Sequence, residues 1–202
     1  MTHEIIKIID RLQPKLFIFD CDGTVMDTLT AHYKAWNATF AKFNLPFITE
    51  LEFMTTYKGM NGLELVESIA NLHQFQPNVN QMLAEKNVLF DKTYSFQVKP
   101  FADIIEIINH YYNKIPMSIA SNGCRDTIKK MLKYNNLEHI FELVIGIEDV
   151  SYGKPNPEMF LLSANKLNVA HANCLIFEDS EHGFTAATLA NMNFIDVPRY
   201  RN

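Results

Sequence analysis

Short apolar runs alternate with longer amphipathic stretches along most of the chain. The first run, residues 15–19, ends abruptly in the polar, glycine-containing segment 20–24, which is typical of a buried parallel strand that meets its loop. Three later runs lead into polar segments in the same way, and one further run follows near residue 194. We therefore predict five strands, over residues 15–19, 115–120, 143–147, 174–177 and 194–197.

The stretches between these runs have the periodicity of helices. Apolar residues recur at steps of three and four positions over residues 101–112, 125–135, 157–167 and 183–191. Strands that alternate with helices predict a parallel sheet with helices on both of its faces. The predicted fold class is therefore α/β, with a Rossmann-like parallel sheet.

One long segment breaks this alternation. It contains three stretches of helical period, with no convincing strand pattern between them, at residues 31–43, 62–73 and 80–94. No internal repeat or Gly/Ser-rich linker separates it from the rest of the chain. We predict an α/β core domain from residues 1–28 and 100–202, and an inserted α-helical cap domain, residues 29–99, that covers the sheet as a lid.

The composition is that of a globular protein. The 202 residues are 48% hydrophobic and 20% charged, with a mean hydropathy of −0.08, which is enough apolar material for a sizeable core. The longest apolar runs are far shorter than the roughly 20 residues that a membrane-spanning helix needs, so we expect no membrane association. The N-terminal sequence lacks the apolar core of a signal peptide, and we expect a cytoplasmic location.

Charge and cysteine content argue against two further classes of site. The formal net charge of −5 is unlike that of a protein that holds nucleic acid on a basic surface. The three cysteines are odd in number and lack C-x-x-C spacing, so we predict neither a disulfide framework nor a zinc site.

Polar side chains follow four of the predicted elements. Ligands of parallel sheets bind beyond the carboxyl ends of the strands, so these side chains are candidates for one site. They are Asp20 and Asp22 after the first strand, Ser121 and Asn122 after the second, Lys154 beyond the third, and Glu178 and Asp179 after the fourth. Converging carboxylates repel one another unless a cation holds them together, and oxygen-only ligands suit Mg²⁺. The sequence therefore predicts a magnesium site.

The same residues fit phosphoryl transfer through an aspartyl-phosphate, in which a carboxylate attacks phosphorus. Asp20 is the candidate nucleophile, and Asp22 is the candidate general acid and then base. Ser121 and Lys154 are placed to stabilise the phosphoryl oxygens. Each motif alone has a simpler role, as a capped turn, a helix N-cap, a surface lysine or the solvated start of a loop. The presence of all these motifs in one chain favours phosphoryl transfer over the simpler roles.

Four segments give the chain a resemblance to a known family. In order, they read FIFDCDGTVMDT (17–28), SIASNG (118–123), GKPNPEMF (153–160) and FEDSEHGFTAA (177–187). Over nearly its whole length the chain resembles the haloacid dehalogenase-like hydrolase superfamily, and most closely its beta-phosphoglucomutase-like branch with a helical cap. The resemblance implies the α/β core and inserted cap of that family.

The resemblance also implies roles for individual residues. Asp20 is implied as nucleophile and Asp22 as acid/base. The implied phosphate-binding residues are Ser121, Asn122 and Lys154. A Mg²⁺ cofactor is implied, with ligands from Asp20, the backbone carbonyl of Asp22, Asp179 and, directly or through water, Glu178. The implied partner is a small phosphorylated substrate, and we expect a monomer.

The first motif and the cap bear on the type of reaction. Dehalogenases of the superfamily lack the second aspartate, so Asp22 favours phosphoryl chemistry. Beta-phosphoglucomutases carry an arginine four residues after the lysine of a K-G-x-x-R segment, but here Gly62 follows Lys58 at that distance. Residues 29–99 contain no arginine, and a glycine does not replace a bidentate phosphate clamp.

These features favour a phosphatase that hydrolyses a small phosphomonoester such as a sugar phosphate. A phosphomutase and a catalytically inactive binding module remain as alternatives. Within the cap, His32 and Lys58 are candidates for substrate contact. We expect four aromatic residues to form the core of the cap, namely Trp36, Phe40, Phe43 and Phe47.

Overall fold

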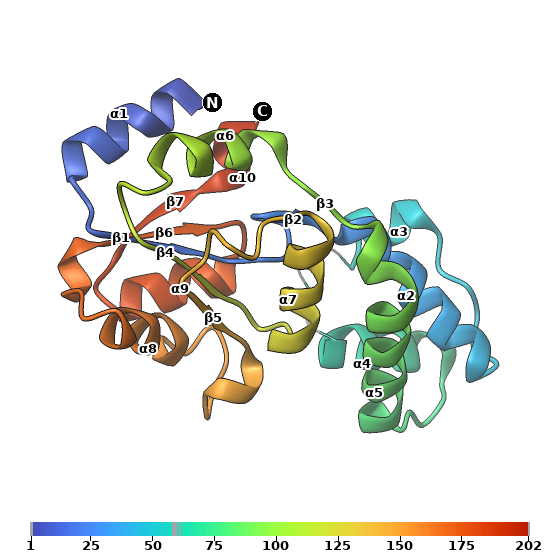
Figure 1. Ribbon diagram of the computed structural model, residues 1–202. Helices are drawn as coiled ribbons and strands as arrows, with labels where there is room; N and C mark the ends of the chain where they lie inside the picture. The colour runs from blue at the N-terminus through green and yellow to red at the C-terminus, as the bar shows by residue number, and fades with distance from the viewer. Residues whose placement is uncertain (1, 58–59, 61, 202) are drawn as a thin grey trace. The chain divides into compact units, whose positions relative to one another are not determined.

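A computed structural model describes residues 2–57, 60 and 62–201, and it divides into two compact units (Figure 1). The sheet unit combines Met1–Asp27 with Val98–Asn202, and the helical unit is Thr28–Gln97. The sequence-based boundaries at residues 28 and 100 compare with 27 and 98 in the structure. The inserted segment is thus a unit of its own.

A five-stranded parallel sheet forms the centre of the sheet unit, in the order β5-β4-β1-β6-β7. Its strands are β1 (Leu16–Phe19), β4 (Met117–Ala120), β5 (Leu143–Ile145), β6 (Cys174–Glu178) and β7 (Asn193–Asp196). All four residues of β1 are buried, as expected for a parallel strand with helices on both faces. The α/β class predicted from the sequence is confirmed.

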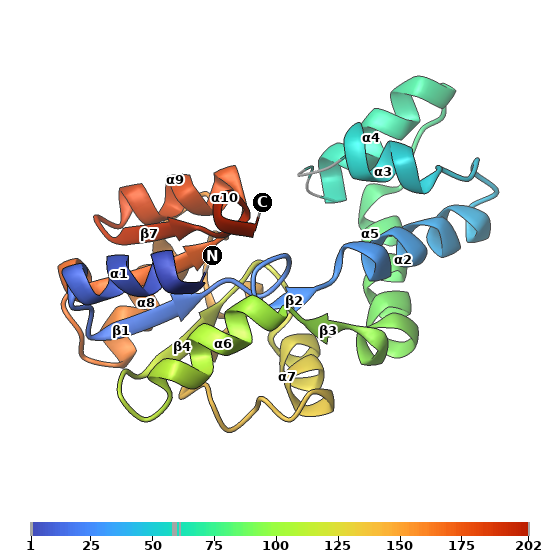
Figure 2. The same ribbon diagram turned by 90° about the horizontal axis from the view of Figure 1, so that it is seen from above.

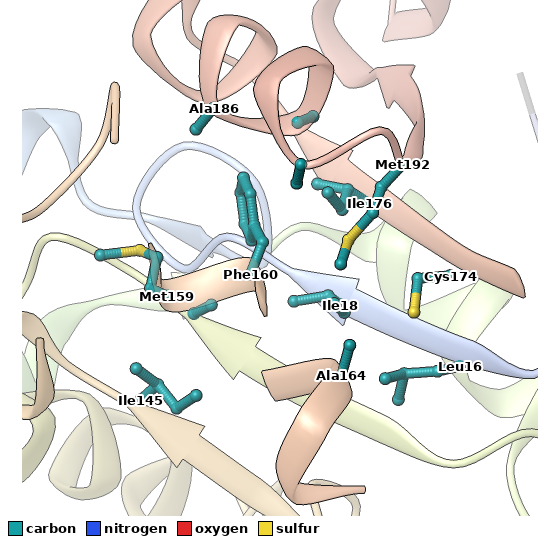
Figure 3. Close-up of a cluster of buried hydrophobic side chains, with 13 residues drawn as sticks. Leu16, Ile18, Ile145, Met159, Phe160, Ala164, Cys174, Ile176, Ala186 and Met192 are labelled. Carbon is teal, nitrogen blue, oxygen red and sulfur yellow. The ribbon is translucent and has the colours of Figure 1, made fainter. Parts of the chain in front are cut away.

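Helices cover both faces of this sheet (Figures 1 and 2). They are α1 (Thr2–Leu12), α6 (Ala102–Tyr111), α7 (Arg125–Tyr134), α8 (Glu158–Lys166), α9 (Glu181–Leu189) and α10 (Val197–Arg201). On one face, Tyr111 of α6 packs edge-on against Phe17 of β1. On the other, α8 and α9 enclose a cluster that includes Ile18, Phe160 and Ile176 (Figure 3). Both faces of the central strands are therefore buried against helices.

The structure adds elements that the apolar pattern did not predict. The two-stranded antiparallel sheet of β2 (Met26–Asp27) and β3 (Lys99–Pro100) is too short to show a period. The predicted last strand also ends one residue too late, because Val197 begins α10. Helix α1 buries Ile5 and Ile9, which are four positions apart, so its signal was present in the sequence.

The helical unit contains α2 (Leu29–Lys42), α3 (Glu50–Thr55), α4 (Gly62–His73) and α5 (Val79–Leu89). The helical stretch expected over 80–94 is confirmed, but its last part, Phe90–Tyr94, is a π-helical turn rather than α-helix. A 3₁₀ turn, Ser95–Gln97, follows it. Trp36 and Phe40 lie in the core of this unit and Phe43 packs against it. Phe47 is 67% exposed and is not a core residue, contrary to expectation.

Within the described part of the chain, none of the helices is both long enough and apolar enough to cross a bilayer.

Candidate active site

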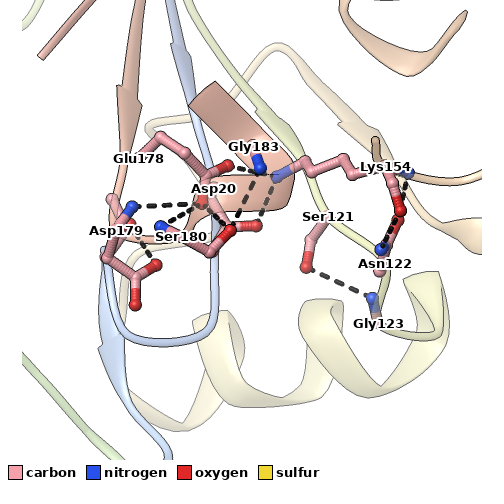
Figure 4. Close-up of polar contacts among 10 residues, drawn as sticks. Asp20, Ser121, Asn122, Gly123, Lys154, Glu178, Asp179, Ser180 and Gly183 are labelled. Carbon is pink, nitrogen blue, oxygen red and sulfur yellow. Dashed lines mark hydrogen bonds and ion pairs between the residues drawn. The ribbon is translucent and has the colours of Figure 1, made fainter. Parts of the chain in front are cut away.

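Loops at the carboxyl ends of adjacent strands place the candidate residues close together (Figure 4). Asp20 directly follows β1, Ser121 follows β4, and Glu178 is the last residue of β6. Since β1 lies between β4 and β6, these three strand ends are neighbours in the sheet. Lys154 reaches the same point from the loop between β5 and α8. The site therefore forms where parallel α/β sheets bind ligands.

Lys154 links two carboxylates that are distant in the sequence. Its Nζ donates to Asp20 Oδ1 at 2.6 Å and to Glu178 Oε2 at 2.7 Å. The side chains are almost fully buried, with 3% of Lys154, 9% of Asp20 and 1% of Glu178 exposed. Burial acts to lower the pKa of Lys154, but the charges and hydrogen bonds of Asp20 and Glu178 outweigh it and raise that pKa overall. The two carboxylates therefore favour the protonated, cationic form of Lys154.

The negative charge of the carboxylates in this site is larger than the positive charge that Lys154 supplies. Burial raises the pKa of Asp20 well above its ordinary value, and the charges of Glu178, Asp179 and Asp22 raise it further, while Lys154 opposes them. Ligand oxygens of Asp20, Glu178 and Asp179 lie within 4.8 Å of one another. An all-oxygen set of carboxylates matches the donor preference of Mg²⁺. These residues could therefore hold a divalent cation.

Asp179 is positioned by the loop that follows β1. Thr24 Oγ1 donates to Asp179 Oδ1 at 3.0 Å, and the backbone of Gly23 lies directly against the same carboxylate. Gly23 has a φ of +83°, and a Cβ at this position would lie 2.2 Å from Asp179 Oδ2. Burial, followed by the charge of Glu178, raises the pKa of Asp179 to about 6. Position 23 therefore requires glycine for two reasons: the positive φ of the backbone, and the lack of space for a Cβ beside the Asp179 carboxylate.

Glu178 is held by four donors. Besides Lys154 Nζ at Oε2, its Oε1 accepts from Asp179 N at 3.0 Å, from Ser180 N at 3.2 Å and from Ser180 Oγ at 2.9 Å. Gly183, in the first turn of α9, packs so tightly here that a Cβ would lie 1.9 Å from Glu178 Cδ. Both carboxylate oxygens are therefore engaged by the protein itself. Sequence reasoning missed Ser180 and Gly183, although both lie within the fourth motif.

Asn122 binds the main chain of Lys154. Its Oδ1 accepts from Lys154 N at 2.8 Å, and its Nδ2 donates to Lys154 O at 3.1 Å. The side-chain amide thus acts as a two-point clamp on the lysine. Ser121, its neighbour, is 2% exposed, and its Oγ accepts from Gly123 N at 3.2 Å. The role of Asn122 in phosphate binding stays a prediction. In the structure, its side-chain amide binds the main chain of Lys154.

The other candidate residues lie in different surroundings. Asp22 is half-buried, and its Oδ2 lies 3.2 Å from the position that a Cβ on Gly123 would occupy, so it faces the loop after β4. Cys21, between the two aspartates, is fully buried. His32 belongs to the helical unit, where its ring stacks on Phe90 at 4.2 Å between centroids. Lys58 lies outside the described residues.

Comparison with known proteins agrees with this arrangement. The chain is 27% identical over 180 residues to the fructose-1-phosphate phosphatase YqaB of Escherichia coli, covering 89% of this chain and 94% of that protein. It is 25% identical over 193 residues to the beta-phosphoglucomutase of Bacillus subtilis, covering 91% and 83%. A structure described as a putative phosphoglycolate phosphatase from Lactobacillus plantarum has the same fold, with a TM-score of 0.77, 19% identity and coverage of 90% and 84%.

The match to a family extends over both units. The sequence model of the haloacid dehalogenase-like hydrolases matches residues 17–197, which include all of β1 except Leu16, the whole helical unit and the strand end that carries Glu178. Every polar strand end described above lies within this range. With the fold, the order of the motifs and the family match in agreement, the chain belongs to the haloacid dehalogenase-like hydrolases.

Proposed function

We propose that the protein is a magnesium-dependent phosphatase that hydrolyses a small phosphomonoester, specifically a sugar phosphate, through an aspartyl-phosphate on Asp20. The observation that carries this proposal is the buried group of Lys154, Asp20 and Glu178 beside Asp179. Several relatives are named for hydrolysis of phosphorylated sugars, among them the fructose-1-phosphate phosphatase of Escherichia coli and a phosphorylated carbohydrates phosphatase of Thermotoga maritima. A sugar phosphate is therefore the substrate class to test first.

In the first step, a carboxylate oxygen of Asp20 attacks phosphorus and the bond from phosphorus to the leaving-group oxygen breaks. Lys154 orients Asp20 through Oδ1, and its ammonium offsets negative charge that develops on the phosphoryl oxygens. Asp22 donates a proton to the departing alkoxide. The hydroxyl of Ser121 is the candidate donor to a phosphoryl oxygen.

In the second step, water attacks the phosphorus of the aspartyl-phosphate. Asp22, now ionised, accepts a proton from this water, and the bond between Asp20 and phosphorus breaks to release inorganic phosphate. Asp22 is thereby returned to its protonated form and Asp20 to its carboxylate. The two aspartates therefore divide the chemistry, one as nucleophile and one as proton carrier.

The residues for a cation are Asp20, Asp179 and the backbone carbonyl of Asp22. A bound Mg²⁺ would neutralise charge on the phosphoryl group as Asp20 approaches it. Glu178 has both oxygens engaged by protein donors, so we propose that it orients Lys154 and reaches the cation through water. Of the two options that the sequence left open for Glu178, direct contact or contact through water, these hydrogen bonds favour the second.

We further propose that the helical unit is the cap domain and supplies specificity for the leaving group. His32 and Lys58 stay the candidates for that contact. The alternative reaction is that of a phosphomutase, which the similarity to the Bacillus subtilis enzyme keeps open, while Gly62 and the absence of arginine from residues 29–99 favour hydrolysis. The protein is proposed to act as a monomer on a small phosphorylated partner.

The test is phosphate release from a panel of sugar phosphates and nucleotides, with Mg²⁺, with a chelator, and with Asp20→Asn beside the parent. Formation of glucose 6-phosphate from beta-glucose 1-phosphate is followed in parallel. Metal-dependent release that Asp20→Asn abolishes supports the phosphatase. Isomerisation without release would replace it by a mutase, and silence in both assays would favour a binding module.

A further inference from the structure

The loop after β1, which carries Asp22, is hydrogen-bonded to residues that lie outside the candidate active site. Three successive backbone carbonyls in this loop each accept a hydrogen bond from a distant segment. Gly23 O accepts from Arg201 Nη1 at 2.6 Å, and Thr24 O accepts from Arg201 Nη2 at 2.7 Å. Val25 O accepts from the backbone N–H of Phe101 at 2.9 Å. One side chain, Arg201, therefore binds two neighbouring peptide groups of the loop.

Arg201 is itself fixed on every nitrogen. Its Nε donates to Asp103 Oδ2 at 2.9 Å, and its guanidinium lies 3.5 Å from the centroid of the Phe101 ring. Only 18% of the side chain is exposed. A planar fork that forms two parallel hydrogen bonds while stacking on an aromatic face is a geometry that arginine has and lysine lacks. The contacts with Asp103 and Phe101 therefore orient Arg201 independently of its hydrogen bonds to the loop.

The peptide groups that Arg201 binds adjoin the reacting groups. The Gly23 carbonyl belongs to the peptide directly after the one that joins Asp22 to Gly23, so Arg201 holds the main chain one residue away from Asp22. Thr24 donates to Asp179 through its hydroxyl, and the backbone of Gly23 abuts the same carboxylate. A shift of this loop would therefore move the carbonyl and side chain of Asp22 and the carboxylate of Asp179 together.

We propose that Arg201 is a positioning residue, which clamps Gly23 and Thr24 and so sets the geometry of Asp22 and Asp179 for phosphoryl transfer. The inference rests on the proposed function for its effect on turnover. Its effect on the loop can be measured without any turnover. It assigns a role in the reaction to a residue that lies outside the four motifs and does not itself touch the carboxylates that Lys154 joins.

The variants are Arg201→Gln and Arg201→Lys, with Arg199→Gln as the matched control. Arg199 is exposed on the same helix, α10, so its replacement removes the same charge but leaves the clamp in place. We expect kcat of Arg201→Gln to fall about tenfold to a hundredfold with little change in KM, because a small displacement of catalytic groups has effects of this size. Arg201→Lys should behave like Arg201→Gln, since one ammonium cannot form the fork.

A second measurement follows the loop directly. The amides of Gly23, Val25 and Met26 are hydrogen-bonded within the loop, so their exchange with deuterated solvent reports its order. We expect faster exchange at these amides in Arg201→Gln and parental exchange in Arg199→Gln. A third variant, Arg201→Ala, should lose kcat as Arg201→Gln does, and adding guanidinium at a non-denaturing concentration should restore part of that loss.

A folded Arg201→Gln protein with parental kcat and parental exchange at these amides would overturn the clamp. Faster exchange in an Arg201→Gln protein whose parent releases no phosphate from any substrate would support the clamp and refute the proposed phosphatase. Equal losses of kcat in Arg201→Gln and Arg199→Gln would overturn the clamp and assign the effect to net charge. The failure of one proposal is therefore distinguishable from the failure of the other.

Discussion

At the scale of single residues, the site depends on charge compensation that the sequence shows only in part. That Asp20, Glu178 and Asp179 lie close together was predictable, because polar residues at the ends of apolar runs share one edge of a parallel sheet. That Lys154 joins Asp20 to Glu178 was not, because side-chain pairing between distant segments leaves no periodic signal.

Removal of Lys154 tests this compensation. In Lys154→Met, the carboxylates of Asp20 and Glu178 stay buried without their counter-ion, and breaking a buried ion pair from one side costs about 3–5 kcal/mol. We expect the free energy of unfolding, from urea titration of the metal-free protein, to fall by about that amount. Lys166→Met, at an exposed position on α8, should change it by less than about 0.5 kcal/mol. A fall of similar size in both variants would contradict the role of the pair.

Asn122 provides a second test at this scale. Asn122→Ala removes both hydrogen bonds to the main chain of Lys154, each worth about 1 kcal/mol. We expect the loss of a correctly placed lysine to lower kcat at least about tenfold, while stability falls by only about 1–2 kcal/mol. Steady-state kinetics and thermal unfolding measure the two effects. Asn165→Ala, exposed on α8, is the control, and parental kcat in Asn122→Ala would show that the clamp is dispensable.

At the scale of elements, the length of a strand or helix determined whether the sequence could predict it. The five strands and the helices between them were found from apolar runs and periods, because each buries a face against its neighbours. The pair β2 and β3 has two residues in each strand, and α10 has five residues, so neither is long enough for a period. The change from α-helix to a π-helical turn at Phe90 leaves the apolar spacing almost unaltered.

The close contact of Gly183, in the first turn of α9, with Glu178 of β6 provides a test of packing between elements. Alanine is about 1 kcal/mol better than glycine in an exposed helix, yet a Cβ at Gly183 would lie 1.9 Å from Glu178 Cδ. We therefore expect Gly183→Ala to destabilise the protein and to lower kcat by displacing Glu178. Thr185→Ala, exposed on the same helix, should keep parental kcat. Higher stability in Gly183→Ala, read by thermal unfolding, would show that Glu178 is less tightly held.

At the scale of the whole molecule, family membership and fold follow from the same motifs. The four segments predicted both, since each motif is also the end of a strand or the start of a helix. Arg201 escaped prediction because 178 and 177 positions separate it from the carbonyls it binds, and an arginine outside any motif has no signature. Only the folded chain brings these residues together.

The proposed cation site lies entirely within the sheet unit. Because Mg²⁺ would bind the folded carboxylates and not the unfolded chain, it should stabilise the protein by about 2.7 kcal/mol at a free concentration about a hundredfold above its Kd. We expect the unfolding temperature to rise on titration with Mg²⁺ and to return on adding a chelator. Asp179→Asn should remove most of this rise, and an unchanged response in that variant would place the ion elsewhere.

The central claim is that Asp20 becomes phosphorylated, and peptide mass spectrometry after rapid acid quench tests it most directly. Asp22→Asn is mixed with p-nitrophenyl phosphate, whose leaving group needs no proton, so the first step proceeds while the second lacks its base. We expect a stoichiometric burst of p-nitrophenol, with one phosphoryl group on the peptide that contains Asp20. Release of p-nitrophenol with the phosphoryl group on another residue, or on none, would contradict the account.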